Sequence, residues 1–235
     1  MFANYHTHTA RCHHATGEDK AYVEAAIQNG FQVLGFSDHC PWIFSDGYVS
    51  PIRMTPDELD GYVTSLTALK KEYAADITIY IGLESEYVPE MLPEQQKFLQ
   101  DYPIDYQILG EHFLYPEQRG IYTGRPTDNT AELKHYVDQV IAGMETGNYL
   151  YLAHPDLFHF IGDPACYEQE FRRLCVYLKE KQIPIEINQL GFADHRQYPN
   201  PAFLKIAESV GNTAIIGCDA HHPSALLDTD SQQAC

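Results

Sequence analysis

The stretch Gln32-Val33-Leu34-Gly35-Phe36-Ser37-Asp38-His39 (QVLGFSDH) shows the pattern on which the fold prediction rests. Its apolar residues follow one another instead of alternating with polar ones, which is typical of a strand buried on both faces. The predicted strand, Gln32–Ser37, is followed at once by a carboxylate and an imidazole. Similar apolar runs recur along the chain at Phe2–Tyr5, Ile77–Leu83, Tyr106–Gly110, Tyr149–Ala153, Ile183–Ile187 and Thr213–Gly217.

Stretches of helical period lie between these runs. Thr16–Asn29 is predicted to be a helix that ends at the glycine after Asn29. Thr55-Pro56-Asp57-Glu58 combines an N-cap, a proline at the first helical position and a capping-box glutamate. Further helices are expected around 133–144, 171–178 and 203–207, the first ending near Gly147 and the last at Gly211. This alternation predicts an α/β fold with a parallel sheet closed into a barrel; an open doubly wound sheet is the alternative.

Composition narrows the class of protein. The chain has 235 residues, and we expect a single domain spanning 1–235. The formal net charge is −18 and no Lys/Arg block is present, so a polynucleotide partner is disfavoured, whereas a small anionic substrate is not. No apolar run is long enough for a membrane span, and no secretory signal precedes the first run. We interpret the six cysteines as reduced thiols of a cytoplasmic protein. The oligomeric state is not indicated.

Side chains of the metal-binding or catalytic type follow every predicted strand. In chain order these are His6 and His8, Asp38 and His39, Glu84, Glu111 and His112, His154, Asn188, and Asp219 and His221. The carboxyl ends of the strands of a parallel barrel converge on one face, where active sites are built. One such histidine would be explained as a structural residue, but the whole set predicts an active site.

Metal chemistry explains this set of residues best. His6 and His8 are two residues apart, which on a strand places both rings on the same side. Imidazoles combined with carboxylates from distant strands suit Zn²⁺, Mn²⁺ or Fe²⁺. The candidate ligands are His6, His8, His14, His39, Glu84, His112, His154, Asp219 and His221. That number suits two to three divalent ions, which activate water and clamp the oxygens of a phosphoryl displacement.

The motifs also resemble a known family. HTHTARCHH (6–14), SDH (37–39), GLE (82–84), GEHF (110–113), HPD (154–156) and CDAH (218–221) resemble, in order, the metal motifs of the polymerase-and-histidinol-phosphatase (PHP) superfamily. They are most similar to its stand-alone histidinol-phosphatase branch, and the resemblance spans roughly residues 2–222. It implies a distorted (βα)7 TIM-like barrel with up to three metals. The implied activity is the hydrolysis of L-histidinol phosphate to L-histidinol and phosphate in histidine biosynthesis.

The resemblance also assigns the ligands to individual ions. One ion would be held by His6, His8, Glu84 and Asp219. Glu84 would bridge to a second ion, held also by His112 and His154. A third ion would be held by His14, His39 and His221. Within this centre, Glu84, Asp219 and His221 are the candidate catalytic residues.

Candidate substrate contacts lie farther along the chain. The stretch EINQLGFADHRQYPNP resembles this branch of the family in its Asn-containing strand end, followed by a basic residue and Tyr-Pro. The resemblance makes Arg196 the candidate phosphate contact, and Asn188 is a second substrate-binding candidate. His159 is the third; it stands where the family often carries an arginine, a departure that would weaken phosphate binding or change the substrate. Glu111 stands where a serine is commoner. The sequence ends soon after His221, where relatives usually continue through a further helix, and this would leave the site more open.

Several alternatives remain open at this point. One alternative to histidinol-phosphatase activity is a phosphoesterase that acts on another small phosphorylated metabolite. Another is a C–N hydrolase of the amidohydrolase type. A non-catalytic metal domain, a protein-tyrosine phosphatase and an exonuclease are less favoured. Cys12, Cys40 and Cys218 are interpreted as small buried fillers rather than soft metal ligands. Asp38 and Asp156 are candidates to orient His39 and His154, and Arg53 and Arg125 are interpreted as solvated surface residues.

Overall fold

The computed structural model of the protein describes residues 2–227, and its α/β class with parallel strands is the class expected from the sequence. The chain divides into two compact units. Of the described residues, unit 1 comprises 2–85, Pro89–Gln107 and 217–227, and unit 2 comprises Glu86–Val88 and Ile108–Ile216. The prediction of a single domain stays a prediction. The chain end beyond Leu227, where we expected a missing helix, lies outside the described residues.

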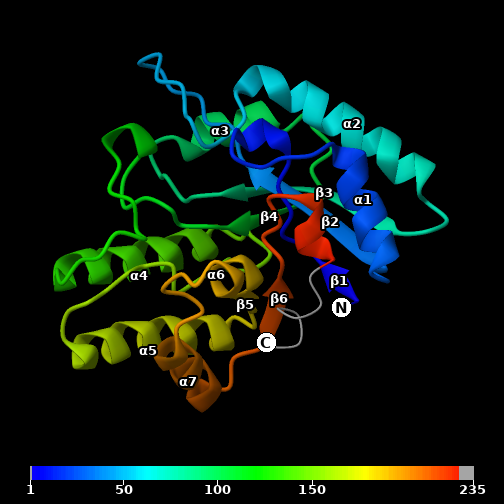
Figure 1. Ribbon diagram of the computed structural model, residues 1–235. Helices are drawn as coiled ribbons and strands as arrows, with labels where there is room; N and C mark the ends of the chain where they lie inside the picture. Colours follow the sequence, from blue (N-terminus) through cyan, green and yellow to red (C-terminus); the bar gives the residue numbers. More distant parts are fainter. Residues whose placement is uncertain (1, 228–235) are drawn as a thin grey trace. The chain divides into compact units, whose positions relative to one another are not determined.

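A parallel sheet positions several candidate site residues of unit 1. Its strand order is β1 (Ala3–Asn4), β2 (Val33–His39), β3 (Thr78–Ser85) and β4 (Tyr106–Leu109), the first two residues of β4 belonging to unit 1. β2 and β3 are parallel, and their register pairs His39 with Glu84. β2 and β3 lie side by side and run in the same direction (Figure 1). An imidazole and a carboxylate therefore lie at the same end of the sheet.

Helices bury the apolar faces of this sheet. α1 (Asp19–Gln28) packs beside α2 (Leu59–Glu72), and α2 packs on β3 (Figure 1). The short helix η2 (Pro56–Glu58) precedes α2, and the Thr55–Glu58 capping box predicted from the sequence is present, with Thr55 N donating to Glu58 Oε2 at 2.8 Å. The remaining helices of unit 1 are η1 (Ala10–Cys12), α3 (Leu92–Leu99) and η4 (Pro223–Leu226), and α3 was not predicted.

Two glycines let an aromatic ring lie directly on the sheet. A Cβ atom at Gly35 would lie 2.3 Å from the hydroxyl of Tyr106, and one at Gly82 would lie 2.5 Å from its ring. The Tyr106 hydroxyl donates to the carbonyls of Tyr5 and Phe36, at 2.7 and 3.0 Å. Tyr106 therefore links the segment after β1 to β2 by hydrogen bonds that need both glycines.

Unit 2 contains its own core. α4 (Thr130–Glu145), α5 (Pro164–Glu180) and α7 (Pro201–Val210) pack in that order, side by side (Figure 1). They cover a second apolar cluster that includes Tyr136, Phe171 and Phe203, all fully buried. A two-stranded sheet pairs β5 (Ile185–Asn188) with β6 (Ala214–Gly217), and the short helices are η3 (Glu117–Arg119) and α6 (Gln189–Ala193).

The run Tyr149–Ala153 differs from its prediction as a strand. Within the described residues it forms only isolated parallel bridges, from Leu152 to Leu109 on one side and to Ile185 on the other. The backbone after it turns at once, because His154 has a φ of 26° and a proline follows. The pairing is therefore too short to count as a strand, although Leu152 lies where the strand was expected.

Asn4 provides a test of how unit 1 is held together. Its fully buried side chain donates to His6 O at 3.0 Å and to Thr7 Oγ1 at 2.7 Å, and it accepts from Cys218 N at 2.9 Å. We expect Asn4→Ala to lower the free energy of unfolding by about 2 kcal/mol, because it leaves buried polar groups without partners. Urea denaturation would measure this, with the exposed Gln32→Ala as control. A loss no larger than about 0.5 kcal/mol, the usual surface value, would contradict it.

Candidate metal centre

His6 and His8 lie just beyond β1, where the chain meets the segment that follows β6. Thr7 between them bridges to Ala220, His8 N donates to Ala220 O at 2.9 Å, and Ala220 N donates to His6 O at 3.2 Å. This pairing brings Asp219 beside the two histidines. Both imidazoles are fully buried, and their ring centroids are 5.2 Å apart.

Two carboxylates face these imidazoles. Asp219 Oδ1 lies 3.4 Å from His6 Nε2 and 3.1 Å from His8 Nε2. Glu84, at the end of β3, lies 3.5 Å from His6 Nε2 through one oxygen and 3.1 Å from His39 Nδ1 through the other. The ligand atoms of His6, His8 and Asp219 fall within 4.8 Å of one another, and so do those of His8, His39 and Glu84.

A three-histidine set lies beside them. The ligand atoms of His14, His39 and His221 also fall within 4.8 Å of one another. His14 Nδ1 lies 2.7 Å from the Cys12 carbonyl and His221 Nδ1 lies 3.0 Å from the Asp219 carbonyl. A carbonyl only accepts, so both Nδ1 atoms carry a proton, and the Nε2 atom of each ring is a lone-pair donor whenever that ring is neutral. These two Nε2 atoms face each other at 3.0 Å.

Such an arrangement fits a shared cation. Two lone pairs directed at each other repel unless a metal ion or a proton stands between them. His8 repeats the pattern, because its Nδ1 lies 3.3 Å from Asp38 and its Nε2 lies 3.1 Å from Asp219. A neutral imidazole donates only once, so His8 either carries two protons or faces Asp219 across a cation. The donor set is nitrogen and carboxylate oxygen, which suits Zn²⁺, Mn²⁺ and Fe²⁺.

The pKa shifts of three of these groups are consistent with a site that binds a cation. Burial opposes ionisation of Asp219, but His6, His8 and His221 hold its pKa well below the usual value. Burial likewise opposes charge on His8, yet hydrogen bonds to Asp219 and Asp38 raise its pKa well above the usual value. Burial and the neighbouring charge of His8 lower the pKa of His221 to about 3. Near neutral pH, unit 1 therefore presents an ionised carboxylate and a neutral His221 imidazole.

Unit 2 contains a second pair of histidines. The rings of His112 and His154 have centroids 5.0 Å apart. His112 Nδ1 lies 2.9 Å from Glu86 Oε1, which directs the proton to Nδ1 and leaves the lone pair of the neutral ring on Nε2. The backbone N–H of His154 donates to Glu186 Oε2 at 3.0 Å. Both glutamates are buried and help to fix the two histidines.

The family comparison agrees with the residue pattern. The family model described as "PHP domain" matches residues 4–190. The chain belongs to the PHP family. Among curated proteins, it is 28% identical over 233 residues to the "Probable histidinol-phosphatase" of Deinococcus radiodurans, covering 94% of this chain and 86% of that one. It is 34% identical over 115 residues to the histidinol-phosphatase of Bacillus subtilis, covering 46% of this chain and 43% of that one.

Solved structures share the fold of this PHP chain. A Lactococcus lactis histidinol phosphate phosphatase, crystallised with zinc, L-histidinol and phosphate, aligns with a TM-score of 0.73 at 19% identity. The alignment covers 99% of this chain and 91% of that one. A Listeria monocytogenes protein named as a candidate histidinol phosphatase aligns with a TM-score of 0.78 at 20% identity, covering 99% and 100%.

The candidate substrate contacts of the PHP chain are engaged within unit 2. The Arg196 guanidinium donates to Asp194 Oδ2 at 2.8 Å and to the Tyr198 hydroxyl at 3.2 Å. Asn188 caps α6 by accepting from Gly191 N at 2.9 Å, and its amide donates to Glu186 Oε2 at 2.9 Å. His159 exchanges backbone hydrogen bonds with Thr123 and Thr127. The roles proposed for these three residues in substrate binding stay predictions.

Asp38 has a different partner from the one expected. It was a candidate to orient His39, but its Oδ1 lies against the ring of His8 and accepts from His39 only through the backbone N–H, at 2.8 Å. Its other oxygen accepts from the backbone N–H of Thr9 at 3.2 Å and from the Thr9 hydroxyl. Similarly, Asp156 accepts from the backbone of Asn200. The sequence alone predicts that such carboxylates lie near the site, but not which residue each side chain contacts.

Other site predictions need correction or addition. Arg53 is not a solvated residue: it is 1% exposed and donates to the Cys40 carbonyl at 3.1 Å. Arg125 does lie near the surface, paired with Glu132 at 2.8 Å. Glu86 was missed, and the only sequence signal was its spacing of two from Glu84, which puts both side chains on one side of an extended chain.

Asp38 offers a test of the centre. In Asp38→Asn an amide NH2 would face the donor groups of His8, His39 or Thr9, so the His8 ring would lose its orientation. We expect metal affinity to fall about 10- to 100-fold, as is usual for partners that orient a ligand. Competition with a chromophoric chelator would measure it. The exposed Asp76→Asn has the same charge change and serves as control; equal affinities of the two variants would exclude this role for Asp38.

Proposed function

We propose that this protein is a metal-dependent phosphomonoesterase that hydrolyses L-histidinol phosphate to L-histidinol and phosphate, a reaction of histidine biosynthesis. The observation that carries the proposal is the opposed Nε2 pair of His14 and His221, 3.0 Å apart inside a cluster of further imidazoles and carboxylates. Support for the substrate comes from the Deinococcus relative over 94% of the chain and from the zinc, L-histidinol and phosphate bound by the Lactococcus structure.

The candidate ligands would be divided between at least two divalent ions. His6, His8, Glu84 and Asp219 would hold one divalent ion, and His14, His39 and His221 would hold another. The assignment of His112 and His154 to an ion bridged by Glu84 stays a prediction. Bound Zn²⁺, Mn²⁺ or Fe²⁺ would lower the pKa of a water and neutralise charge on the phosphate oxygens. Asp38 keeps a proton on His8 Nδ1, and Glu86 keeps one on His112 Nδ1, so that the Nε2 atoms serve as ligands.

The fold proposal is a distorted (βα)7 TIM-like barrel forming one domain over 1–235. It is supported by parallel bridges at the positions where neighbouring barrel strands would pair. Within unit 2, Leu152 bridges Leu109 and Ile185, and within unit 1, Thr7 bridges Ala220. The Lactococcus and Listeria structures support the same fold.

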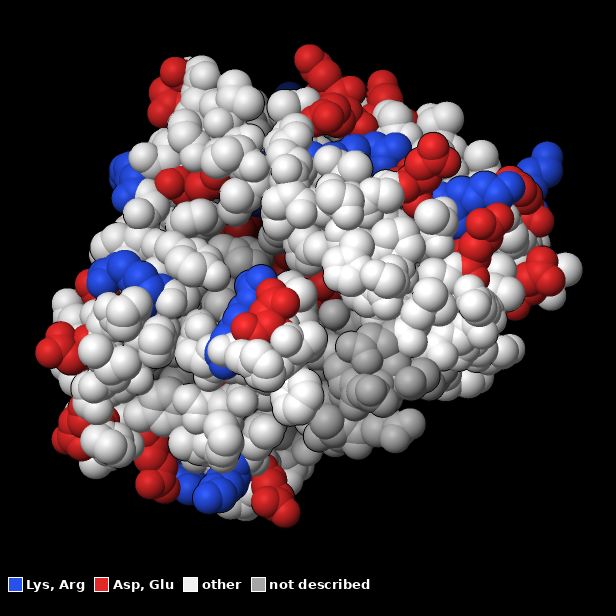
Figure 2. Space-filling model, in the orientation of Figure 1, with Lys and Arg blue, Asp and Glu red and all other residues white. Residues whose placement is uncertain are grey.

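The surface suits a small anionic substrate. Figure 2 shows the Lys and Arg side chains of one face in separate places, several of them beside acidic side chains. The ion pairs of the described residues include Arg172–Glu168 and Lys134–Asp138, at 2.8 and 2.6 Å. A phosphate group would therefore be attracted by ions in the centre rather than by a basic patch on this face. Among the described residues, no helix is both long enough and apolar enough to cross a bilayer. A cytoplasmic location stays part of the proposal.

Metal content and turnover test the function together. We expect the purified protein to contain about two to three divalent ions per chain and to release phosphate faster from L-histidinol phosphate than from p-nitrophenyl phosphate. Inductively coupled plasma mass spectrometry and a phosphate assay measure the two quantities. Chelation should abolish turnover, and added Zn²⁺ or Mn²⁺ should restore it.

The outcomes separate the alternatives. Fewer than two ions per chain with no phosphate release from either substrate would overturn the proposal. Comparable release from both substrates would keep the phosphatase but remove the specific substrate. Amide hydrolysis without phosphatase activity would indicate a C–N hydrolase instead.

Arg196 tests substrate binding. If its guanidinium contacts the phosphate, Arg196→Met removes a charge-assisted hydrogen bond, and we expect KM for L-histidinol phosphate to rise about tenfold or more. Arg172→Met is the matched control, because Arg172 is a surface arginine of unit 2 that is likewise paired with a carboxylate. Steady-state kinetics give KM for both variants. An unchanged KM in Arg196→Met would limit this residue to holding Asp194 and Tyr198.

A further inference from the structure

Arg11 is held within unit 1 by several groups instead of extending into solvent. It lies in η1, three residues after the candidate ligand His8, and its side chain is only 23% exposed. Its Nη1 donates to Asp19 Oδ1 at 2.9 Å and to the hydroxyl oxygen of Thr9 at 3.2 Å. The guanidinium carbon lies 5.7 Å from the centroid of the Tyr62 ring, within the range of a cation–π contact. An ion pair with Asp19 alone does not explain why Nη1 also contacts Thr9.

The contact with Thr9 sets the direction of a hydroxyl group. The Thr9 hydroxyl oxygen accepts from Arg11 Nη1 and also, at 3.4 Å, from Arg11 N. A hydroxyl has one proton, and with two donors directed at its oxygen that proton is left to be donated. It is donated to Asp38 Oδ2, which also accepts from Thr9 N at 3.2 Å. Arg11 therefore favours the one orientation of the hydroxyl that binds Asp38.

Asp38 connects this hydroxyl to the metal centre. Its Oδ1 lies 3.3 Å from His8 Nδ1, and a carboxylate at this position holds a proton on Nδ1 and fixes the ring. The other ring nitrogen of His8, Nε2, is then directed at Asp219, 3.1 Å away. The orientation of His8 thus depends on Asp38, and that of Asp38 depends on Thr9.

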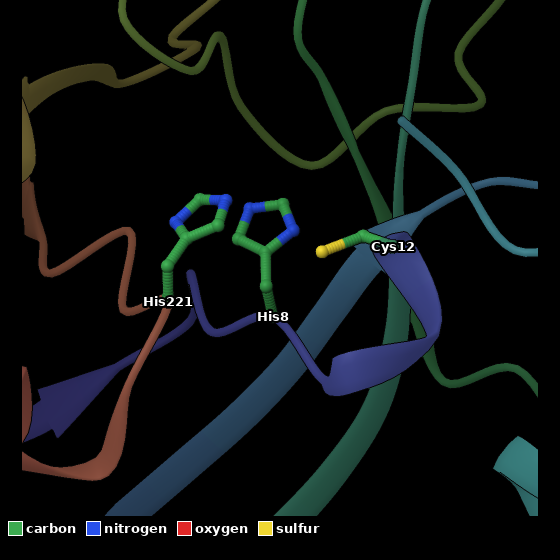
Figure 3. Close-up of side chains that lie close together, drawn as sticks. All are labelled: His8, Cys12 and His221. Carbon is green, nitrogen blue, oxygen red and sulfur yellow. The ribbon is translucent and has the colours of Figure 1, made fainter. Parts of the chain in front are cut away.

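The turn that contains Arg11 also packs against the His8 ring. Figure 3 shows Cys12, the last residue of η1, directed toward one side of the His8 ring, with His221 on the other side. Both Cys12 and His8 are fully buried. Because Cys12 directly follows Arg11, a displacement of Arg11 would also disturb this packing.

Asp19 fixes the far end of the same chain of hydrogen bonds. It is the first residue of α1, and its Oδ2 accepts from the Ser65 hydroxyl of α2 at 2.5 Å. Its side chain is 10% exposed, and the two helices pack on each other. Arg11 therefore links a rigid pair of helices to the Thr9 hydroxyl and so to the end of β2.

We propose that Arg11 is a positioning residue for the candidate metal ligand His8, acting through the Thr9 hydroxyl and Asp38. The inference rests on the proposed metal centre and does not depend on the substrate. With Arg11 in place, the Thr9 proton is directed at Asp38, and the carboxylate is held against His8. Without Arg11 the hydroxyl is free to rotate, and ordering these groups adds an entropic cost to metal binding.

The metal affinities of two charge-removing variants test this role. We expect Arg11→Met to lower the apparent Zn²⁺ affinity for one bound ion about tenfold, the low end of the usual cost of losing a group that orients a ligand. Lys20→Met is the matched control, because Lys20 is exposed, pairs with Glu72 at 2.8 Å and lies 5.5 Å from the centroid of the Tyr73 ring. That substitution removes the same charge from the same kinds of contact and leaves Thr9 unaffected. Competition with a chromophoric chelator measures both affinities.

Proton NMR of the zinc-loaded protein gives a second readout. An Nδ1–H that donates to a carboxylate gives a signal far downfield, and the signal that disappears in Asp38→Asn belongs to His8. We expect this signal in the wild type and in Lys20→Met, and its loss in Arg11→Met. The reason is that the proton exchanges faster with water once Asp38 is no longer held.

A double-mutant cycle shows whether Arg11 acts through Thr9. Thr9→Val removes the hydroxyl and keeps the ion pair between Arg11 and Asp19, and we expect it to lower the same Zn²⁺ affinity about tenfold. Adding Arg11→Met to Thr9→Val should then change the affinity by no more than about twofold, since the connection is already broken. A general loss of stability would instead make the two effects multiply.

The possible failures are distinguishable. Equal Zn²⁺ affinities of Arg11→Met and Lys20→Met, or losses that multiply in the double variant, would overturn the role of Arg11 and leave the proposed phosphatase intact. An unchanged affinity in Thr9→Val would overturn it even if Arg11→Met did not fold. A wild type that binds no Zn²⁺ would overturn the metal centre and this inference together. Zinc binding with the expected variant effects but without phosphate release would remove the phosphatase and support the role of Arg11.

Discussion

Electron-pair donors crowded into one region, part of it buried and part open to solvent, are the constraint on which unit 1 depends. His14 and His221 each donate a hydrogen bond from Nδ1 to a backbone carbonyl, and their Nε2 atoms face each other. Asp219 adds a carboxylate oxygen to the same region. Donors that face each other in this way repel unless a proton or a metal ion lies between them, and the repulsion is strongest in the buried part of the cluster. The surrounding hydrogen bonds of Asn4 and Asp38 resist that repulsion, and a bound cation would turn it into attraction.

Much of the backbone arrangement that brings these residues together could be predicted from the hydrophobic runs of the sequence. A parallel register needs only two buried runs in the same direction, and the runs around Phe36 and Ile81 are long enough to fix one another. Once they pair, His39 and Glu84 must be neighbours, whatever the side chains do. The positions of Asp219 and His221 follow in the same way from the bridge between Thr7 and Ala220. These features depend on the backbone, and the backbone follows hydrophobic pattern and spacing.

Features that depend on side-chain direction were less predictable. Asp38 contacts His8 rather than the His39 ring because the Thr9 turn approaches it from a distant part of the chain. Arg53 is buried because its long side chain reaches the Cys40 carbonyl, and no periodicity reveals that. The run at Leu152 has the composition of a strand, but the turn at His154 limits its pairing to single bridges. The short helix α6 depends on the cap by Asn188, a residue considered earlier only for substrate binding.

The contact of Tyr106 with Gly35 and Gly82 couples three positions that are far apart in the sequence. A methyl group at either glycine would overlap the tyrosine, so an alanine there becomes tolerable only after position 106 has become smaller. That smaller residue would no longer donate to the carbonyls of Tyr5 and Phe36. Replacing a glycine first creates an overlap, and replacing Tyr106 first removes its hydrogen bonds, so both routes lower stability. Among relatives, these three positions should therefore vary together or not at all. Because Tyr5 directly precedes His6, the same coupling limits how far the backbone can change at the first candidate ligand during evolution.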